Sequence, residues 1–310
     1  MKNITYLYFA FLILSSCENM QTVIDLELPP HESKLLINSS NLIGSPFKVF
    51  VSHSIDPLSN QKFEFYSDAQ VVLYQNLQAI DTLVFVDSLR CYRSHQIPQQ
   101  GTAYNLSVSH HKHQTVKSKS ILAPNVIEIT TVTHTKPDVN ETNISFIEFS
   151  ISDPIEPNFY LLELSAYYSF INENGQKMVE KQSLYYNTSD PSITNGIQEF
   201  DEIYSNKVLF DDQLFNGQKK SFELSYENYY QNFDTDSLKM DSIKISLHSL
   251  DYDYFNYHQS RILQNNTEGG EIFGSEPVNI YNSFKNDDGT ENAYGLFSII
   301  SKDTFMIDVD

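Results

Sequence analysis

Residues 104–109 read Tyr104-Asn105-Leu106-Ser107-Val108-Ser109 and carry the clearest pattern in the chain. The first, third and fifth residues of this stretch are apolar, and the residues between them are polar. In a β-strand successive side chains point to opposite faces of the sheet, so this alternation predicts a strand that packs one face on a core. The stretch sets the interpretation of the remaining sequence.

Similar short runs occur on both sides of this stretch and are separated by turn-forming residues such as Pro57, Gly101 and Pro124. They cover residues 34–38, 48–52, 68–74, 82–86, 147–152, 160–166, 222–227, 243–248, 295–299 and 305–309. The chain also holds 20 Tyr and 21 Phe, which favour strands. The pattern predicts an all-β, mainly antiparallel protein.

The spacing of the first strands predicts an N-terminal β-sandwich over residues 34–123, of an Ig-like or transthyretin-like kind. Ala123-Pro124 is the preferred boundary, and residues 124–310 are expected to form a second β-rich domain. Residues 171–200 are polar and are expected to form hairpin loops.

One segment departs from the strand pattern. Residues 251–266 contain no proline or glycine, and Tyr252, Phe255, Ile262 and Leu263 recur near a 3.6-residue period. An aspartate at 251 or 253 can cap the start, and a Gly-Gly pair follows the end. A single helix near 251–266 is therefore predicted within the second domain.

The N-terminus has the parts of a secretory signal. Lys2 precedes a short apolar run at residues 6–14, which is too short to span a bilayer. Leu14-Ser15-Ser16-Cys17 resembles a bacterial lipobox, so residues 1–16 are predicted to be a signal peptide and Cys17 the lipidated residue. Residues 17–33 are then a tether. The alternative is an ordinary secretory signal in which Cys17 is incidental.

Charge narrows the range of partners. The chain has 20 basic and 40 acidic residues, which argues against nucleic acid and against adsorption to anionic lipid. The membrane is therefore expected to be reached through lipid on Cys17. Several acyl chains are needed for stable anchoring, because one chain holds only marginally.

Histidines gather at residues 110–113. In a strand His111 and His113 share a face, but no third ligand follows at a recognisable spacing, and an exposed hairpin tip is the preferred interpretation. The acidic residues 286–291 lack the spacing of a calcium-binding EF-hand loop. Neither a metal nor a cofactor is expected.

Hydrolytic motifs are absent from the sequence. It contains no Gly-x-Ser-x-Gly elbow and no His-Glu-x-x-His. Cys91 lies in a predicted strand, where a lone thiol usually serves packing. The expectation is that the protein is not an enzyme, and a hydrolase of envelope polymers is the least favoured alternative.

Short segments in a fixed order resemble the DUF4249 family of Bacteroidota lipoproteins. Besides the lipobox they are residues 32–37, 69–73, 101–108, 153–160, 209–217, 254–257, 274–278 and 295–297. The sequence departs from the family near residues 282–284, where the family has a glycine-rich turn and this chain has an acidic insert at 286–292. A ligand contact shared with the family in that loop is therefore in doubt.

The resemblance implies a place beside TonB-dependent outer-membrane receptors. The expected function is that of an outer-membrane binding or accessory module for nutrient uptake, on the cell surface, with the periplasmic face as the alternative. A structural or adhesion protein of the envelope is the second hypothesis. The tentative binding residues for a small-molecule, peptide or glycan ligand are Tyr252, Tyr254, Tyr257, Asp211 and Asp212.

Overall fold

Strands dominate the structure, as the alternating sequence pattern predicts. The computed structural model describes residues 31–56, 58–60, 62–136, 143–199, 207–227, 238–268, 278–284 and 292–309. The predicted signal peptide, Cys17 and most of the tether lie outside these ranges, as does the acidic run 286–291. The described residues from Ser33 onward belong to one compact unit.

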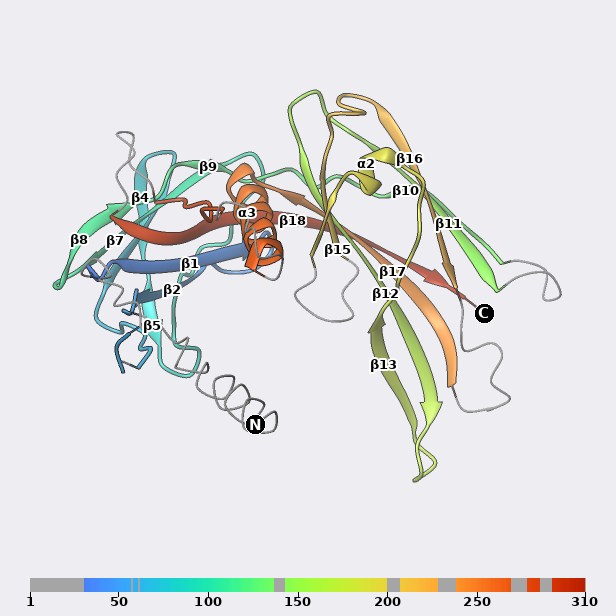
Figure 1. The fold of residues 1–310 in the computed structure, drawn as a ribbon, viewed down its shortest axis with the longest axis horizontal. Helices are drawn as coiled ribbons and strands as arrows, with labels where there is room; N and C mark the ends of the chain where they lie inside the picture. The colour runs from blue at the N-terminus through green and yellow to red at the C-terminus, as the bar shows by residue number, and fades with distance from the viewer. Residues whose placement is uncertain are drawn as a thin grey trace, which may run out of the picture. The chain divides into compact units, whose positions relative to one another are not determined.

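The helices and strands follow one another as shown in Figure 1. They are β1 (Leu35–Leu42), β2 (Lys48–His53), β3 (Gln70–Gln75), β4 (Gln78–Thr82), β5 (Val84–Val86), β6 (Cys91–Arg93), β7 (Ala103–His110), β8 (His113–Lys117), β9 (Ile121–Leu122), β10 (Thr130–Thr135), β11 (Ile144–Ser152), β12 (Phe159–Ile171), β13 (Lys177–Ser183), α2 (Pro191–Thr194), β14 (Ile197–Glu199), β15 (Lys207–Asp211), β16 (Lys219–Glu227), β17 (Leu238–Leu250), α3 (Tyr252–Glu268) and β18 (Ala293–Asp308).

These strands form three sheets in the part of the chain that the structure describes. The largest has the order β14-β15-β12-β17-β18-β1-β2-β6-β5, with β13 paired to β12. A second has the order β10-β11-β16, and a third has the order β4-β3-β7-β8, with β9 paired to β7. Among the described strands only β1 and β18 pair in parallel, so the prediction of a mainly antiparallel all-β fold is confirmed.

The stretch at 104–109 forms most of β7. Its apolar side chains are buried as predicted, but Asn105 and Ser107 are also nearly buried. β7 pairs with β3 along one edge and with β8 and β9 along the other, so no edge of this strand is left open at its centre. The strand was predicted correctly, and the solvent exposure of its polar face was not.

Two main hydrophobic clusters hold the sheets together. One joins apolar side chains of β1 and β2 to those of β3 and β7 and also includes Ala123 and, from β18, Phe297. The other begins at Ile127 and joins β12 and β17 to β11 and β16. In each cluster two sheets share a core, which is the arrangement of a β-sandwich.

The strand β18 belongs to both clusters. Phe297 packs in the first cluster and Ile307 in the second. The predicted closing strands at 295–299 and 305–309 both form, but they are parts of one continuous strand that ends at Asp308. The division at residue 123 stays a prediction, and the structure adds that the last strand serves both cores.

The helix α3 confirms the helix predicted near 251–266. Asp251 precedes its first turn, and the backbone N–H of Tyr254 donates to Asp251 Oδ1 at 2.8 Å, which is N-cap geometry. Phe255 and Ile262 are buried, whereas Leu263 is exposed. No helix in the described part of the chain is long and apolar enough to cross a membrane.

The segment 171–200 holds more structure than the predicted loops. A hairpin turn does occur between β12 and β13, but β13 and the four-residue helix α2 follow it. Asp190 caps α2 by accepting the backbone N–H of Ser192, and Pro191 occupies the first turn. The prediction of a single helix therefore missed α2, although a capping aspartate followed by proline is a helix-start signal.

Candidate functional site

A pocket of about 230 Å³ lies between α2, the pair β14–β15, the residues after β15 and α3. Its apolar lining includes Leu209, Leu214 and Phe255, and its polar lining includes Asp211 and Gln259. The loop that follows Asp211 and the helix that carries the predicted tyrosines thus both contribute to one concave site.

Local packing explains why the pocket forms there. Leu209 of β15 and Phe255 of α3 belong to a small apolar cluster that fixes the helix on the sheet. Ile197 pairs with Leu209, which brings the chain after α2 against β15. At Gly196 an added Cβ would lie 2.7 Å from the Leu209 carbonyl oxygen, so only glycine allows this close approach.

The two predicted acidic residues have different environments. Asp211 lines the pocket, and its carboxylate accepts hydrogen bonds from the backbone N–H of Gln213 at 3.2 Å and the Gln213 amide at 2.9 Å. Asp212 is buried and accepts the backbone N–H of Asn158 at 2.8 Å. Burial raises the pKa of Asp212. Asp211 can therefore meet a ligand, whereas Asp212 holds the loop in place.

The three predicted tyrosines are not among the residues that line the pocket. Tyr252 is 58 % exposed and meets the ring of Phe159 edge-on at 5.7 Å. Tyr254 is partly buried, and its ring lies 4.2 Å from that of His258. Tyr257 lies beside the same histidine. The helix instead contributes Phe255 and Gln259, which the tyrosine-rich composition of this segment did not single out.

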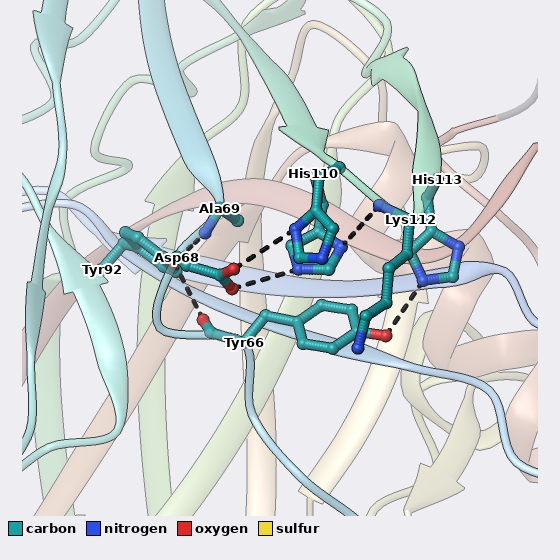
Figure 2. Close-up of polar contacts among 8 residues, drawn as sticks. Tyr66, Asp68, Ala69, Tyr92, His110, Lys112 and His113 are labelled. Atoms are coloured by element: carbon teal, nitrogen blue, oxygen red, sulfur yellow. Dashed lines mark hydrogen bonds and ion pairs between the residues drawn. The ribbon is translucent and has the colours of Figure 1, made fainter.

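A second cluster lies at the tip of the β7–β8 hairpin, and Figure 2 shows its polar contacts. His110 Nε2 lies 3.1 Å from Asp68 Oδ1, and His111 Nδ1 lies 3.3 Å from Asp68 Oδ2. The side chain of His110 is 1 % exposed, while those of Asp68 and His111 are 59 % and 64 % exposed. A buried imidazole thus lies beneath two accessible ligand groups.

The hydrogen bonds of His110 define its tautomer. The backbone N–H of Lys112 donates to His110 Nδ1 at 3.3 Å, so the ring proton resides on Nε2 and is donated to Asp68. The Tyr66 ring stacks on the imidazole at 3.8 Å with an interplanar angle of 7°. Although burial acts to raise it, the pKa of Asp68 is lowered, because His110 and His111 stabilise its charge.

His113, which was expected to share a face with His111, does not belong to this cluster of ligand groups. His113 lies beside the Tyr66 hydroxyl, with 3.0 Å between Nε2 and the phenol oxygen. The third ligand group that the spacing argument lacked is Asp68, which precedes His110 by 42 residues. The predicted hairpin tip is confirmed, since His111 and Lys112 form an exposed turn. Only the pairing of β3 with β7 brings Asp68 close, and no local spacing reveals it.

Cys91 is free and buried in β6. Burial raises the pKa of its thiol, although the positive charges of Lys48 and Arg93 act to lower it. A nucleophilic cysteine requires a thiolate, so this environment supports a packing role.

No curated protein matches the chain. The model of one family, described as a domain of unknown function (DUF4249), matches residues 21–305. The chain therefore belongs to this family, and the resemblance found in the sequence is confirmed.

Proposed function

We propose that this member of the DUF4249 family is an outer-membrane lipoprotein that captures a small ligand for a TonB-dependent transporter. The lipobox-like residues 14–17 support the anchor, with Cys17 as the lipidated residue. The pocket beside α3 carries the binding part of the proposal, because the loop after β15 and the helix converge on it. The body is expected at the cell surface, and the periplasmic face is the alternative.

The pocket lining indicates the ligand class. Leu214 and Phe255 offer apolar surface, while Asp211 and Gln259 offer hydrogen-bonding groups. A volume of about 230 Å³ is below the ~300–1,000 Å³ of sites for drug-sized ligands. This combination suits a compact unit with one apolar and one polar side, such as a single residue of a peptide or glycan.

We propose binding alone for this pocket, without a chemical step. Asp211, the acid in the pocket lining, is engaged by Gln213, and the thiol of Cys91 is buried elsewhere. The function is therefore retention of a ligand near the membrane, with the tether 17–33 setting how far the body reaches.

The test compares four forms of the protein in a deletion strain: wild type, Cys17→Ser, Leu214→Trp and Leu58→Trp. Leu214 lines the pocket, whereas Leu58 is an exposed residue between β2 and β3, so it provides a matched control for an added indole. We expect wild type to sediment with the outer membrane and to co-purify with a large barrel protein. Cys17→Ser should move to the soluble fraction.

Ligand binding is measured on the purified proteins by thermal shift with amino acids, short peptides and glycans. One class should raise the melting temperature of wild type and Leu58→Trp but not of Leu214→Trp. Binding that persists in Leu214→Trp would remove the pocket from the proposal. Absence of any barrel partner, together with normal growth of the deletion strain on defined nutrients, would favour a structural or adhesion protein.

A further inference from the structure

The Asp68, His110 and His111 side chains place three ligand atoms within 4.8 Å of one another. We propose that they form a binding site for a transition-metal ion of the Zn²⁺, Co²⁺ or Ni²⁺ kind. The site is separate from the pocket beside α3 and does not depend on the proposed ligand function. It adds a metal-binding property that the spacing of residues in the sequence does not show.

The separations match those in a metal centre. In a tetrahedral zinc site with bonds of about 2.0–2.2 Å, neighbouring ligand atoms lie about 3.3–3.6 Å apart. Asp68 Oδ1 lies 3.1 Å from His110 Nε2 and Asp68 Oδ2 lies 3.3 Å from His111 Nδ1. The ligand atoms that the three residues offer all lie within 4.8 Å of one another. Binding of one ion by all three groups requires the exposed side chains of Asp68 and His111 to turn toward it.

Neighbouring groups hold the ligands in place. Tyr66 stacks on His110, and its ring fixes the orientation of the buried imidazole. The Tyr92 hydroxyl donates to the Tyr66 carbonyl at 2.9 Å and accepts the backbone N–H of Ala69 at 2.7 Å. These two bonds clamp the chain on both sides of Asp68, as Figure 2 shows. Such supporting contacts raise metal affinity because less ordering remains for the binding step.

The donor set selects the kind of metal. Two imidazoles and one carboxylate favour Zn²⁺, Co²⁺, Ni²⁺ or Cu²⁺ over Ca²⁺ and Mg²⁺, which prefer oxygen ligands. Three protein ligands leave at least one coordination position to water or to a group of another molecule. Because Asp68 and His111 are more than half exposed, this open position faces solvent.

Binding requires one proton to move. The Nε2 proton of His110 now points at Asp68, and a metal ion at Nε2 leaves the neutral ring with its proton on Nδ1. That proton then faces the backbone N–H of Lys112, so the hydrogen bond at 3.3 Å must break and the hairpin tip must adjust. The Lys112 amide is therefore a direct reporter of coordination by the buried histidine.

The experiment uses the untagged, mature lipoprotein in detergent after EDTA treatment, at pH 7.5. ZnCl₂ is titrated by calorimetry, and CoCl₂ by visible absorption. We expect one ion per chain and a Co²⁺ spectrum typical of four or five ligands. Asp68→Asn and His111→Ala should each weaken Zn²⁺ binding by at least about tenfold. Both residues are exposed, so circular dichroism should show unchanged folding.

Two control variants separate this site from other histidines. His95→Ala removes an exposed histidine away from the cluster and should leave Zn²⁺ binding unchanged. His113→Ala tests the pairing suggested by sequence alone and should weaken binding less than Asp68→Asn, because Nε2 of His113 is engaged with Tyr66. In protein labelled with ¹⁵N-lysine, the Lys112 amide signal should shift on adding Zn²⁺.

The proposal is overturned by any of three results. These are no saturable binding of Zn²⁺ or Co²⁺, binding that is unaffected by Asp68→Asn, and a Lys112 amide signal that does not move. Binding lost in His111→Ala but kept in Asp68→Asn would indicate a surface histidine pair without the carboxylate, and this too contradicts the site as proposed.

Discussion

His248 is a buried histidine whose ring makes no hydrogen bond, and its pKa is lowered as a result. The residue lies on β17 and is 9 % exposed, and neither ring nitrogen has a hydrogen-bond partner. Glu163 Oε2 lies 4.0 Å from its Nε2. Burial, together with the positive charge of Lys302, lowers the pKa of His248 to about 4. The native state therefore favours the neutral ring.

This shift predicts a pH dependence of stability. The pKa of His248 is 6.5 in the unfolded chain and about 4 in the folded chain. At pH values between these two, the unfolded chain binds a proton at His248 that the folded chain does not. The free energy of unfolding should thus fall as the pH drops from about 6.5 to about 4. In His248→Gln the loss between pH 7 and pH 4.5, measured by urea unfolding, should be smaller by about 2–3 kcal/mol.

The control for this measurement is His95→Gln, because His95 is exposed. It should keep the pH dependence of the wild type. An equal loss of stability in His248→Gln and wild type would show that His248 is not the group responsible.

Some contacts of single residues could be predicted from the sequence, and others could not. Asp251 or Asp253 was predicted to cap the helix, and Asp251 does so through a contact only three residues along the chain. Its second oxygen accepts the backbone N–H of Ile299 at 2.6 Å, 48 residues away, which no local pattern reveals. Asp68 near His110 is another such case. Contacts within a turn can be predicted, and contacts made by strand pairing cannot.

Among the elements, β18 combines a local restriction with long-range pairing. Gly295 pairs with Ile37 of β1 and has a φ of +131°, in the region that favours glycine. An added Cβ would overlap the Ile37 carbonyl oxygen. The parallel approach of β1 and β18 therefore requires glycine at this position.

Gly295→Ala should destabilise the protein by about 3 kcal/mol or more, since strain and a backbone clash act together. Urea unfolding followed by far-UV circular dichroism gives the value. Gly175→Ala is the matched control, because Gly175 also has a positive φ but has no atom within 4 Å of the added Cβ. Its cost should be about 1–2 kcal/mol. Equal costs for the two variants would contradict the clash at Ile37.

Strand positions were largely predictable, and strand partners were not. The alternation at 222–227 and 243–248 lies within β16 and β17. However, β16 pairs with β11. The strand β17 pairs with both β12 and β18, so these three strands meet although they lie far apart in the sequence. The pocket depends on such pairing, because β14 and β15 bring α2 to α3. Its residues could be predicted only as separate segments.

For the whole molecule, the shared strand β18 couples the two hydrophobic clusters. Losing either core leaves half of β18 without its packing. We therefore expect Leu73→Ala, a change in the first cluster, to lower the stability of both clusters by about 2–5 kcal/mol. Hydrogen exchange of the most protected amides in β7 and in β11 measures this directly.

An exposed substitution, Val84→Ala on β5, should leave exchange in both regions unchanged. If Leu73→Ala increases exchange in β7 but not in β11, the two clusters unfold independently and β18 does not couple them.

The parallel pairing of β1 with β18 also sets an order of events during synthesis. Leu35 meets Ala293, so the partner of the first strand emerges about 260 residues after it. At about 5–20 residues per second this delay is on the order of tens of seconds. Throughout that time β1 has one unpaired edge that other chains can join. Closure of the large sheet must therefore await the synthesis of β18, because β18 joins β1 to β17.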